Sequence, residues 1–328
     1  MKISLLDKLC CPYSKLPLKL GPDSIVVDGE VVNGTLCTYD DKYKYDIKAS
    51  VPRFVTDSNY ADNFGIQWNY FSKTQLDSHS GYPISGNRFW RATGWKPEEL
   101  MGKWVLDVGC GAGRFAEIAL NAGANVVALD YSSAVDACYG NLKKFDNLHV
   151  IQGDIYSLPF FEQSFQFVYS LGVLQHTPDV KRAFQALPPM LVPNGRICVD
   201  YYWKRFQTVM HSKYLVRPFT KRMQKNKLFG LLKRLVPSML LLSRRINKLP
   251  GLGKIIKRVV PVADYTGVYP LSDKQLSEWA LMDTFDMLGP RYDSPQRKKK
   301  IYSWMVETGF RDIEVFHETL LVSRGIKG

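Results

Sequence analysis

The segment WVLDVGCGAGRF, residues 104–115, places three alternate glycines directly behind an apolar run. Residues 104–108 are mostly apolar or β-branched and predict a buried strand. Gly109, Gly111 and Gly113 follow, and a glycine lets a ligand approach the backbone closely because it has no Cβ. We therefore expect a strand and a ligand-binding turn at the carboxyl end of that strand, where open α/β sheets hold ligands. A purely structural tight turn is the alternative.

The residues behind the glycines favour the ligand-binding interpretation. Residues 114–123 have the apolar spacing of an amphipathic helix. A second apolar run, residues 125–129, ends in Asp130 and Tyr131. An acidic residue at the end of the second strand, about 20 residues past the glycines, is placed to accept hydrogen bonds from ribose hydroxyls.

Strand and helix patterns alternate through residues 104–200, which predicts a parallel sheet with helices on both faces. The expected later strands are 150–155, 167–170 and 196–201, and the expected helices are 133–145 and 179–191. A helix over 301–309 and a hairpin of 313–317 with 320–323 would complete the sheet.

The pattern DxGxGxG, which begins at Asp107, resembles the first motif of class I S-adenosylmethionine (SAM) methyltransferases. It differs from the GxGxxG turn of dinucleotide-binding proteins, so an NAD-dependent oxidoreductase is disfavoured. The segments 150–155 and 167–176 and the turn 193–195 are similar to later motifs of the same family. The resemblance implies an α/β fold with a Rossmann-like seven-stranded sheet, and SAM as cofactor, with S-adenosylhomocysteine as product.

The resemblance also implies roles for individual residues. Asp107 would orient the glycine turn near the methionine part of SAM, and Gly109, Gly111 and Gly113 would admit the cofactor. The remaining implied cofactor-binding residues are Asp130 and Tyr131 at the ribose, Asp154 and Ile155 at the adenine, and Leu171 beside the methyl donor.

Residues 1–57 read as a small β-rich module that resembles the zinc-ribbon-like domain preceding some methyltransferase cores. That domain carries CPxC and CxxC pairs, whereas this chain has one cysteine in each, Cys11 and Cys37. A structural zinc requires four ligands. We therefore expect a degenerate ribbon, although Cys10 and Asp40 are possible substitutes, and we assign no metal ligand anywhere in the chain.

Residues 58–103 are rich in aromatic and polar side chains and predict a lid or packing segment over the cofactor site. Phe64, Trp68 and Phe71 have helical spacing that suggests one face packed on the core. In the methyltransferases that this chain resembles, the corresponding segment folds over SAM. Tyr60, Gln67 and Arg88 are therefore candidates to contact the carboxylate of the cofactor or to cover it.

The charge of the chain is concentrated in one segment. The net charge is +13, yet residues 201–263 hold sixteen Lys or Arg and no acidic residue, which leaves 28 basic and 31 acidic residues elsewhere. We read 201–300 as a basic helical cap inserted into a core of 104–200 plus 301–328, with Pro237, Pro250, Gly251 and Gly253 dividing it into short helices.

Three interpretations of the basic insert remain open. Its leucines can pack on the domain while its lysines are solvated. Alternatively, its basic amphipathic helices can contact an anionic membrane or a lipid-linked acceptor. Nucleic acid is the less favoured partner, because the segment lacks an RNA-binding motif.

The catalytic candidates follow from position. His176 follows the fourth expected strand at the carboxyl edge, where a base could assist transfer to a hydroxyl or amine. Residues 283–286 and 290–296 read either as an acceptor-site loop or as a structural loop, and Tyr292 and Asp293 are the further catalytic candidates. The acceptor we expect is small, of a lipid-linked or glycan type, and methylated on oxygen or nitrogen.

The composition is that of a globular protein: 45% hydrophobic and 23% charged residues, and no apolar run of the ~20 residues that a membrane span needs. Six cysteines without a secretory signal favour a cytoplasmic location, with peripheral membrane contact as an option. A non-catalytic SAM-fold binding protein, or an RNA methyltransferase, is the alternative to the enzyme with a small acceptor.

Overall fold

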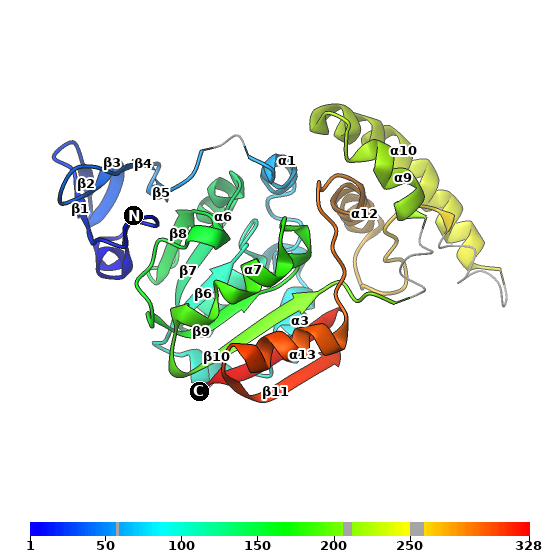
Figure 1. The fold of residues 1–328 in the computed structure, drawn as a ribbon. Helices are drawn as coiled ribbons and strands as arrows, with labels where there is room; N and C mark the ends of the chain where they lie inside the picture. Colours follow the sequence, from blue (N-terminus) through cyan, green and yellow to red (C-terminus); the bar gives the residue numbers. More distant parts are fainter. Residues whose placement is uncertain (57–58, 206–211, 250–258) are drawn as a thin grey trace.

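A mixed sheet runs through the whole molecule in the computed structural model, which describes residues 1–56, 59–205, 212–249 and 259–328 (Figure 1). The sheet has twelve strands in the order β1-β3-β4-β5-β8-β7-β6-β9-β10-β12-β11, with β2 paired to β3. The strands are β1 (Leu18–Leu20), β2 (Ile25–Val27), β3 (Glu30–Thr38), β4 (Lys44–Lys48), β5 (Val51–Arg53), β6 (Trp104–Val108), β7 (Asn125–Asp130), β8 (Leu148–Gln152), β9 (Phe165–Ser170), β10 (Leu191–Tyr201), β11 (Phe310–His317) and β12 (Leu321–Lys327).

Seven of these strands form the predicted core. From β8 to β10 neighbouring strands are parallel, whereas β12 lies antiparallel between β10 and β11. Strand order reverses on either side of β6, so the turns after β6 and β9 open at a topological switch point, where doubly wound sheets bind ligands. The prediction of a Rossmann-like seven-stranded sheet with the class I methyltransferase order is confirmed.

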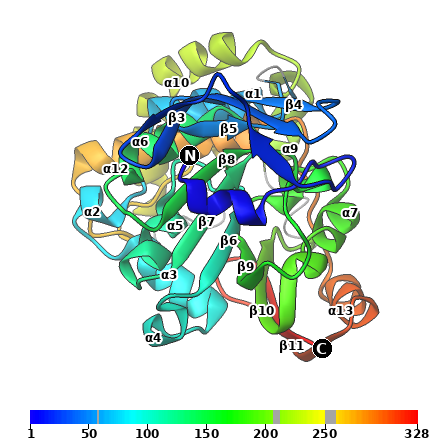
Figure 2. The ribbon, with the colours of Figure 1, turned by 90° about the vertical axis from the view of Figure 1, so that its left-hand side faces the viewer.

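The helices of the described segments cover both faces of the core sheet, except those within residues 213–288, which lie to one side of it (Figures 1 and 2). They are α1 (Asp62–Tyr70), α2 (Asp77–Ser80), α3 (Ile84–Thr93), α4 (Pro97–Leu100), α5 (Arg114–Asn121), α6 (Ala134–Leu142), α7 (Val180–Gln185), α9 (Lys213–Thr220), α10 (Lys225–Asn247), α12 (Asp273–Leu288) and α13 (Lys298–Glu307). Because side chains alternate along a strand, Leu106 packs in one apolar cluster with α7 and α13, while Val105 packs in another with α3, α5 and α6.

The N-terminal strands extend the sheet of the core. Arg53 of β5 pairs with Gln152 of β8, and the Phe54 amide donates to the Gln152 carbonyl at 2.8 Å. Met1 and Leu5 are buried in the same apolar cluster as Leu106. The N-terminal part and the core therefore share one sheet and one apolar cluster, and the division of the chain at residue 57 stays a prediction.

The cysteines of this N-terminal part are free and buried. The Cys11 thiol lies 3.1 Å from the Tyr45 hydroxyl, and the Cys37 thiol points to the Lys19 carbonyl at 3.8 Å. No group of three or more potential metal-ligating side chains was found in the described residues. The resemblance of this part to a zinc ribbon stays a prediction.

The insert has its own apolar cluster, formed by α10, α12 and Phe71 next to α1. The expectation that Pro237 ends a helix is wrong, because Pro237 lies inside α10, which is 23 residues long. Pro237 lies on the exposed side of α10, where water can satisfy the carbonyl group that the ring displaces. The expected breaks at Pro250, Gly251 and Gly253 fall outside the described residues.

Other element boundaries shift for local reasons. The helix expected over 179–191 ends as α7 at Gln185, before Pro188 and Pro189, which cannot continue its hydrogen bonding. The carboxylate of Asp179 caps α7 by accepting from the Arg182 amide at 3.1 Å.

Within the described ranges, no helix has both the length and the hydropathy needed to cross a bilayer.

Candidate cofactor and acceptor site

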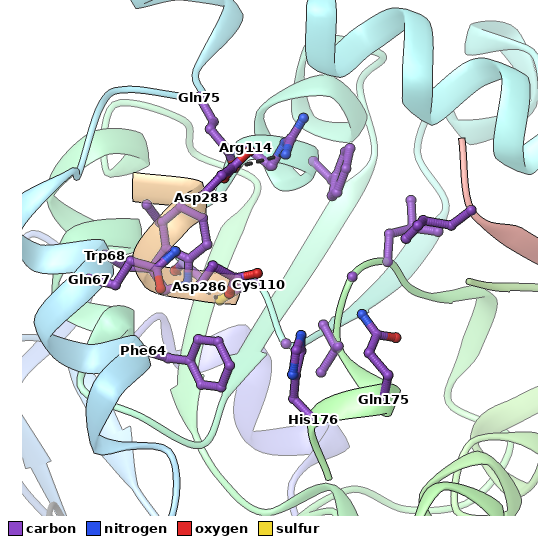
Figure 3. A pocket seen from close by; sticks show the side chains of 18 of the residues that line it. Phe64, Gln67, Trp68, Gln75, Cys110, Arg114, Gln175, His176, Asp283 and Asp286 are labelled. Carbon is purple, nitrogen blue, oxygen red and sulfur yellow. Dashed lines mark hydrogen bonds between the residues drawn. The ribbon is translucent and has the colours of Figure 1, made fainter. Parts of the chain in front are cut away.

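A cavity of about 600 Å³ opens at the carboxyl edge of the core sheet. Its walls come from the turns after β6, β7, β8 and β9, from α1 and α3, and from the insert and the β11–β12 hairpin. Figure 3 shows that side chains from α1, α12 and the segment after β9 point into the same space. This cavity therefore joins the predicted cofactor edge to the insert.

The glycine turn after β6 forms the floor of the cavity at two positions. Gly109 and Gly111 line the cavity and have φ of 86° and 53°, a region that favours glycine. A Cβ on Gly109 would lie 2.4 Å from Val173, and one on Gly111 would lie 3.1 Å from the Trp68 ring. Because neither glycine has a Cβ, the turn can lie this close to Val173 and Trp68.

Gly113 has a different role from the predicted one. Its φ is 93°, and an added Cβ would meet Leu142 and Cys138 of α6 rather than the cavity. Gly113 does not line the cavity. It allows α5 to begin close to α6, so it supports the turn from behind.

Asp130 holds the turn together from the end of β7. Its Oδ2 accepts from the Gly111 amide at 2.9 Å, and its Oδ1 accepts from the Ser132 amide and hydroxyl at 2.8 and 2.7 Å. Burial raises the pKa of this carboxyl despite those hydrogen bonds. Asp130 and Tyr131 both line the cavity, as a ribose-binding role requires.

The other cofactor candidates divide into two groups. Ile155 and Leu171 line the cavity. Asp154 does not, because its carboxylate accepts from the Tyr156 amide at 2.9 Å and caps a short helix. Asp107 is 2% exposed and lies behind the turn, where burial raises its pKa to about 8.

Helix α1 and its surroundings close the cavity from above the sheet. Phe64 and Trp68 line it, so this face is a wall of the cavity rather than a face packed on the core. Tyr60, Gln67 and Arg88, the predicted carboxylate or lid residues, line it as well. Gln67 is fully buried, and neither its side-chain oxygen nor its side-chain nitrogen has a hydrogen-bond partner among the described residues. A buried, unsatisfied amide that lines a cavity is a candidate to hydrogen-bond a ligand.

Arg88 and Arg114 differ in how their charges are balanced. Arg88 forms an ion pair with Asp200 at 2.7 Å. Arg114 lines the cavity and donates to the neutral Gln75 side-chain oxygen at 2.8 Å (Figure 3). It also donates to the Ser85 hydroxyl at 3.1 Å. Burial lowers the pKa of Arg114 to about 10. Such a guanidinium suits a ligand carboxylate, a role that the sequence analysis missed because Arg114 follows the glycines as an ordinary helix residue.

His176 is the predicted catalytic residue that the structure brings to the cavity. Its Nδ1 lies 3.1 Å from the Tyr292 carbonyl oxygen, and its buried Nε2 has no hydrogen-bond partner in the part of the chain that the structure describes. A carbonyl oxygen only accepts, so Nδ1 donates to it, and in the neutral imidazole Nε2 is the nitrogen with the lone pair. Gln175, fully buried with neither amide atom hydrogen-bonded, lines the cavity beside it.

Tyr292 and Asp293, the other two catalytic candidates, are not among the residues that line the cavity, and their catalytic roles stay predictions. Tyr292 contributes its main-chain carbonyl to His176. Asp293 is held at 2.8 Å by Lys213 and at 3.7 Å by Arg217 of α9. These contacts are structural, because they fasten the 290–296 segment to the insert.

The wall that the insert contributes is aromatic and acidic. Asp283 and Asp286, on α12 rather than in a loop, line the cavity with Tyr265, Tyr269 and Trp279. The Tyr265 hydroxyl and the Trp279 indole donate to Asp283 at 2.5 and 3.1 Å. Burial raises the pKa of Asp283 to about 6 and also raises that of Asp286.

Known proteins resemble the part of the chain that carries the glycine turn and Asp130. Residues 106–199 match the family described as "Methyltransferase domain". The chain is 36% identical over 118 residues to sterol 24-C-methyltransferase of Pneumocystis carinii, a match that covers 34% of this chain and 30% of that protein. It is 29% identical over 115 residues to the ubiquinone biosynthesis O-methyltransferase of Coxiella burnetii, covering 34% of this chain and 49% of that protein.

The matched part thus spans between about a third and a half of these curated relatives. Among solved structures, the chain is similar to phosphoethanolamine N-methyltransferase 2 of Haemonchus contortus in complex with S-adenosyl-L-methionine, with 15% identity, a TM-score of 0.46, and coverage of 84% of this chain and 49% of that one. The family match and the strand order of the sheet lead to one conclusion: residues 106–199 form a SAM-dependent methyltransferase domain of the class I fold.

Proposed function

We propose that the whole chain is an active SAM-dependent methyltransferase whose acceptor binds against the insert. The observation that carries this proposal is the continuity of the cavity: the turn held by Asp130 and the wall formed by Asp283 and Asp286 enclose one space. Catalysis of group transfer depends first on holding two reactants together in the right orientation. The cavity extends from the cofactor-binding edge of the sheet to the insert, so it can hold both reactants side by side.

The residues at the cofactor end fit SAM by their chemistry. Gly109 and Gly111 leave room beside the backbone, Asp130 accepts hydrogen bonds from ribose hydroxyls, and Arg114 with the orphaned Gln67 suits the amino-acid end. When bound there, the cofactor supplies an electrophilic methyl group on its sulfonium.

His176 would act as the general base for the acceptor. His176 lines the cavity, and its buried Nε2 has no hydrogen-bond partner among the described residues, so in the neutral imidazole this atom can take the proton from an acceptor hydroxyl as that oxygen becomes methylated. The ring is held by the Tyr292 carbonyl on its Nδ1 side and lies edge-on to Tyr202 with ring centres 5.4 Å apart. These contacts would keep Nε2 aimed at the acceptor.

The insert wall suggests a hydroxyl-rich acceptor of the glycan type. Aromatic rings such as Tyr269 and Trp279 can cover the apolar face of a sugar ring, while Asp286 can accept hydrogen bonds from its hydroxyls. An amine acceptor is the alternative, because buried carboxylates beside aromatic rings also favour a cation.

A direct experiment tests both levels of the proposal. Mass spectrometry of the purified protein should detect bound SAM or S-adenosylhomocysteine. Release of S-adenosylhomocysteine should then rise with hydroxylated glycan acceptors and not with their amine analogues; the reverse preference would favour N-methylation. Cofactor binding without turnover on any small acceptor or on RNA would favour a non-catalytic binding protein instead.

A further inference from the structure

Helix α10 separates its side chains into two faces. Leu228, Leu232, Val236 and Leu240, spaced four residues apart, are buried in the apolar cluster of the insert and account for one face. We name the exposed side of this helix the outer face of α10. The helix itself lies at the side of the molecule remote from the N-terminal strands (Figure 1).

The outer face combines exposed leucines with basic side chains. Its apolar members are between 41% and 51% exposed: Leu231, Leu235, Leu241 and Leu242. The exposed basic members on the same side of the helix are Lys227, Arg234 and Arg245. Single exposed leucines are ordinary on a protein surface, but four on one helical face form a patch that marks an interaction site.

Helix α9 presents a second exposed apolar edge. Leu215 and Phe219, four residues apart, are 78% and 74% exposed. On the other side of α9, Lys213 and Arg217 are buried and hold Asp293. The same short helix therefore supports the cavity wall on one side and offers large apolar side chains to the outside on the other.

The charge around these faces has one sign. Residues 201–263 contain no Asp or Glu, and no ion pair of Lys227, Arg234 or Arg245 occurs among the described residues. An uncompensated row of cations beside aliphatic side chains is the pattern of helices that lie in the interface of an anionic membrane, with the charges at the head groups and the leucines in the acyl boundary.

From this arrangement we propose that the outer face of α10, together with Leu215 and Phe219, binds the surface of an anionic lipid bilayer. RNA fits less well, because the large exposed apolar side chains of α10 are leucines and its one aromatic side chain, Phe229, is buried, so α10 offers no exposed ring to stack on bases. An acidic protein partner would satisfy the cations equally and is an outcome of the test below. The proposal is independent of methyl transfer, since none of the outer-face residues lines the cavity.

Co-sedimentation of the full-length protein with vesicles tests the proposal. We expect binding to vesicles of phosphatidylcholine with about 30% phosphatidylglycerol, and at least ~10-fold weaker binding to pure phosphatidylcholine. Binding should also weaken as salt rises from low to physiological concentration.

Two variants separate the charged and apolar contributions. A triple exchange of Lys227, Arg234 and Arg245 to Gln should reduce the partition coefficient by at least ~10-fold. A triple exchange of Leu231, Leu235 and Leu242 to Gln leaves the net charge unchanged and should weaken binding by a similar factor. The melting temperature of each variant, with and without S-adenosylhomocysteine, verifies that the fold is intact.

A matched control removes the same charge elsewhere. Arg297, Lys298 and Lys299 are exposed at the start of α13, and their exchange to Gln should change vesicle binding less than 2-fold. Absence of binding to anionic vesicles at low salt would overturn the proposal. So would an equal loss in the control variant, undiminished binding of the leucine variant, or a preference for single-stranded RNA or an acidic polypeptide over the vesicles.

Discussion

The Nδ1 atom of His176 lies 3.1 Å from the main-chain carbonyl oxygen of Tyr292. Tyr292 is 116 residues further along the chain and belongs to the segment that joins the insert back to the core. This contact favours the neutral tautomer with the proton on Nδ1 and the lone pair on Nε2. A main-chain carbonyl near the end of the insert thus orients a side chain that follows a strand of the core sheet.

The first prediction separates a base from a structural histidine. In a His176→Asn variant the amide nitrogen can still donate to the Tyr292 carbonyl, but no group replaces Nε2. We expect kcat to fall about 10²-fold while the affinity for SAM changes little. Steady-state release of S-adenosylhomocysteine and calorimetric titration of SAM measure the two quantities. Unchanged turnover would reduce His176 to a packing residue.

The second prediction concerns the ribose contact. Replacing Asp130 by Ala removes the acceptor for the Gly111 and Ser132 donors as well as the proposed ribose partner. The ribose would lose two charge-assisted hydrogen bonds to the carboxylate, so we expect the Kd for SAM to rise at least ~100-fold. The exposed Glu162→Gln variant is the control for removal of a negative charge. Equal titration heats for wild type and Asp130→Ala would remove the assignment.

The third prediction assigns the amino-acid end of the cofactor. Arg114→Gln should raise the Kd for S-adenosylhomocysteine between about 10- and 100-fold, because a charge-assisted contact to the carboxylate is lost. The same variant should bind 5′-methylthioadenosine, which lacks that carboxylate, as well as wild type does. Equal losses for both ligands would mean that Arg114 only shapes the cavity.

The fourth prediction concerns the backbone of the turn. Gly109→Ala combines a positive φ with a Cβ that would lie 2.4 Å from Val173. We expect the free energy of unfolding to fall by ~2 kcal/mol or more. Gly140→Ala, in the last turn of α6 with open space where a Cβ would lie, should instead leave stability unchanged or raise it by up to ~1 kcal/mol. Urea denaturation of both variants compares them directly.

The fifth prediction uses the raised pKa of Asp283. Burial lifts it from 3.8 to about 6, so between these values the folded protein binds a proton that the unfolded chain has released. This contribution to stability is complete below about pH 4 and is lost as the pH rises through about 6. Asp283→Asn stays neutral and should lose less stability than wild type over that range.

Denaturation curves at several pH values between about 4 and about 7 measure the effect. The Tyr265 hydroxyl can still donate to the Asn side chain, which limits the structural change. Parallel pH profiles for wild type and Asp283→Asn would contradict a protonated Asp283 in the folded state at mildly acidic pH.

The central motif could be predicted from the sequence because its determinants are local. The run 104–108 and the glycines fix a strand and a turn within twelve residues, and Asp130 ends the neighbouring strand. The parallel register of β6 and β7 then brings Asp130 to Gly111. Local pattern and sheet topology agree here, so the prediction needed no distant contact.

The rest of the site depends on contacts between distant segments. Asp293 looked like a reacting group from its polar surroundings, yet Lys213, 80 residues earlier, neutralises it. Arg114 looked like a helix residue, and its hydrogen bonds to the neutral side chains of Gln75 and Ser85 become visible only in the folded chain. Pro237 looked like a helix end, and the packing of α10 on α12 overrides that local preference.

The pairing of β5 with β8 has a consequence for any attempt to shorten the chain. Without residues 1–56, the edge of β8 would expose unsatisfied amide and carbonyl groups, together with the apolar surface now covered by Leu5 and Leu36. A bare sheet margin of this kind recruits other chains. A fragment that begins after residue 56 should therefore self-associate, because the N-terminal strands no longer cover this edge of the sheet.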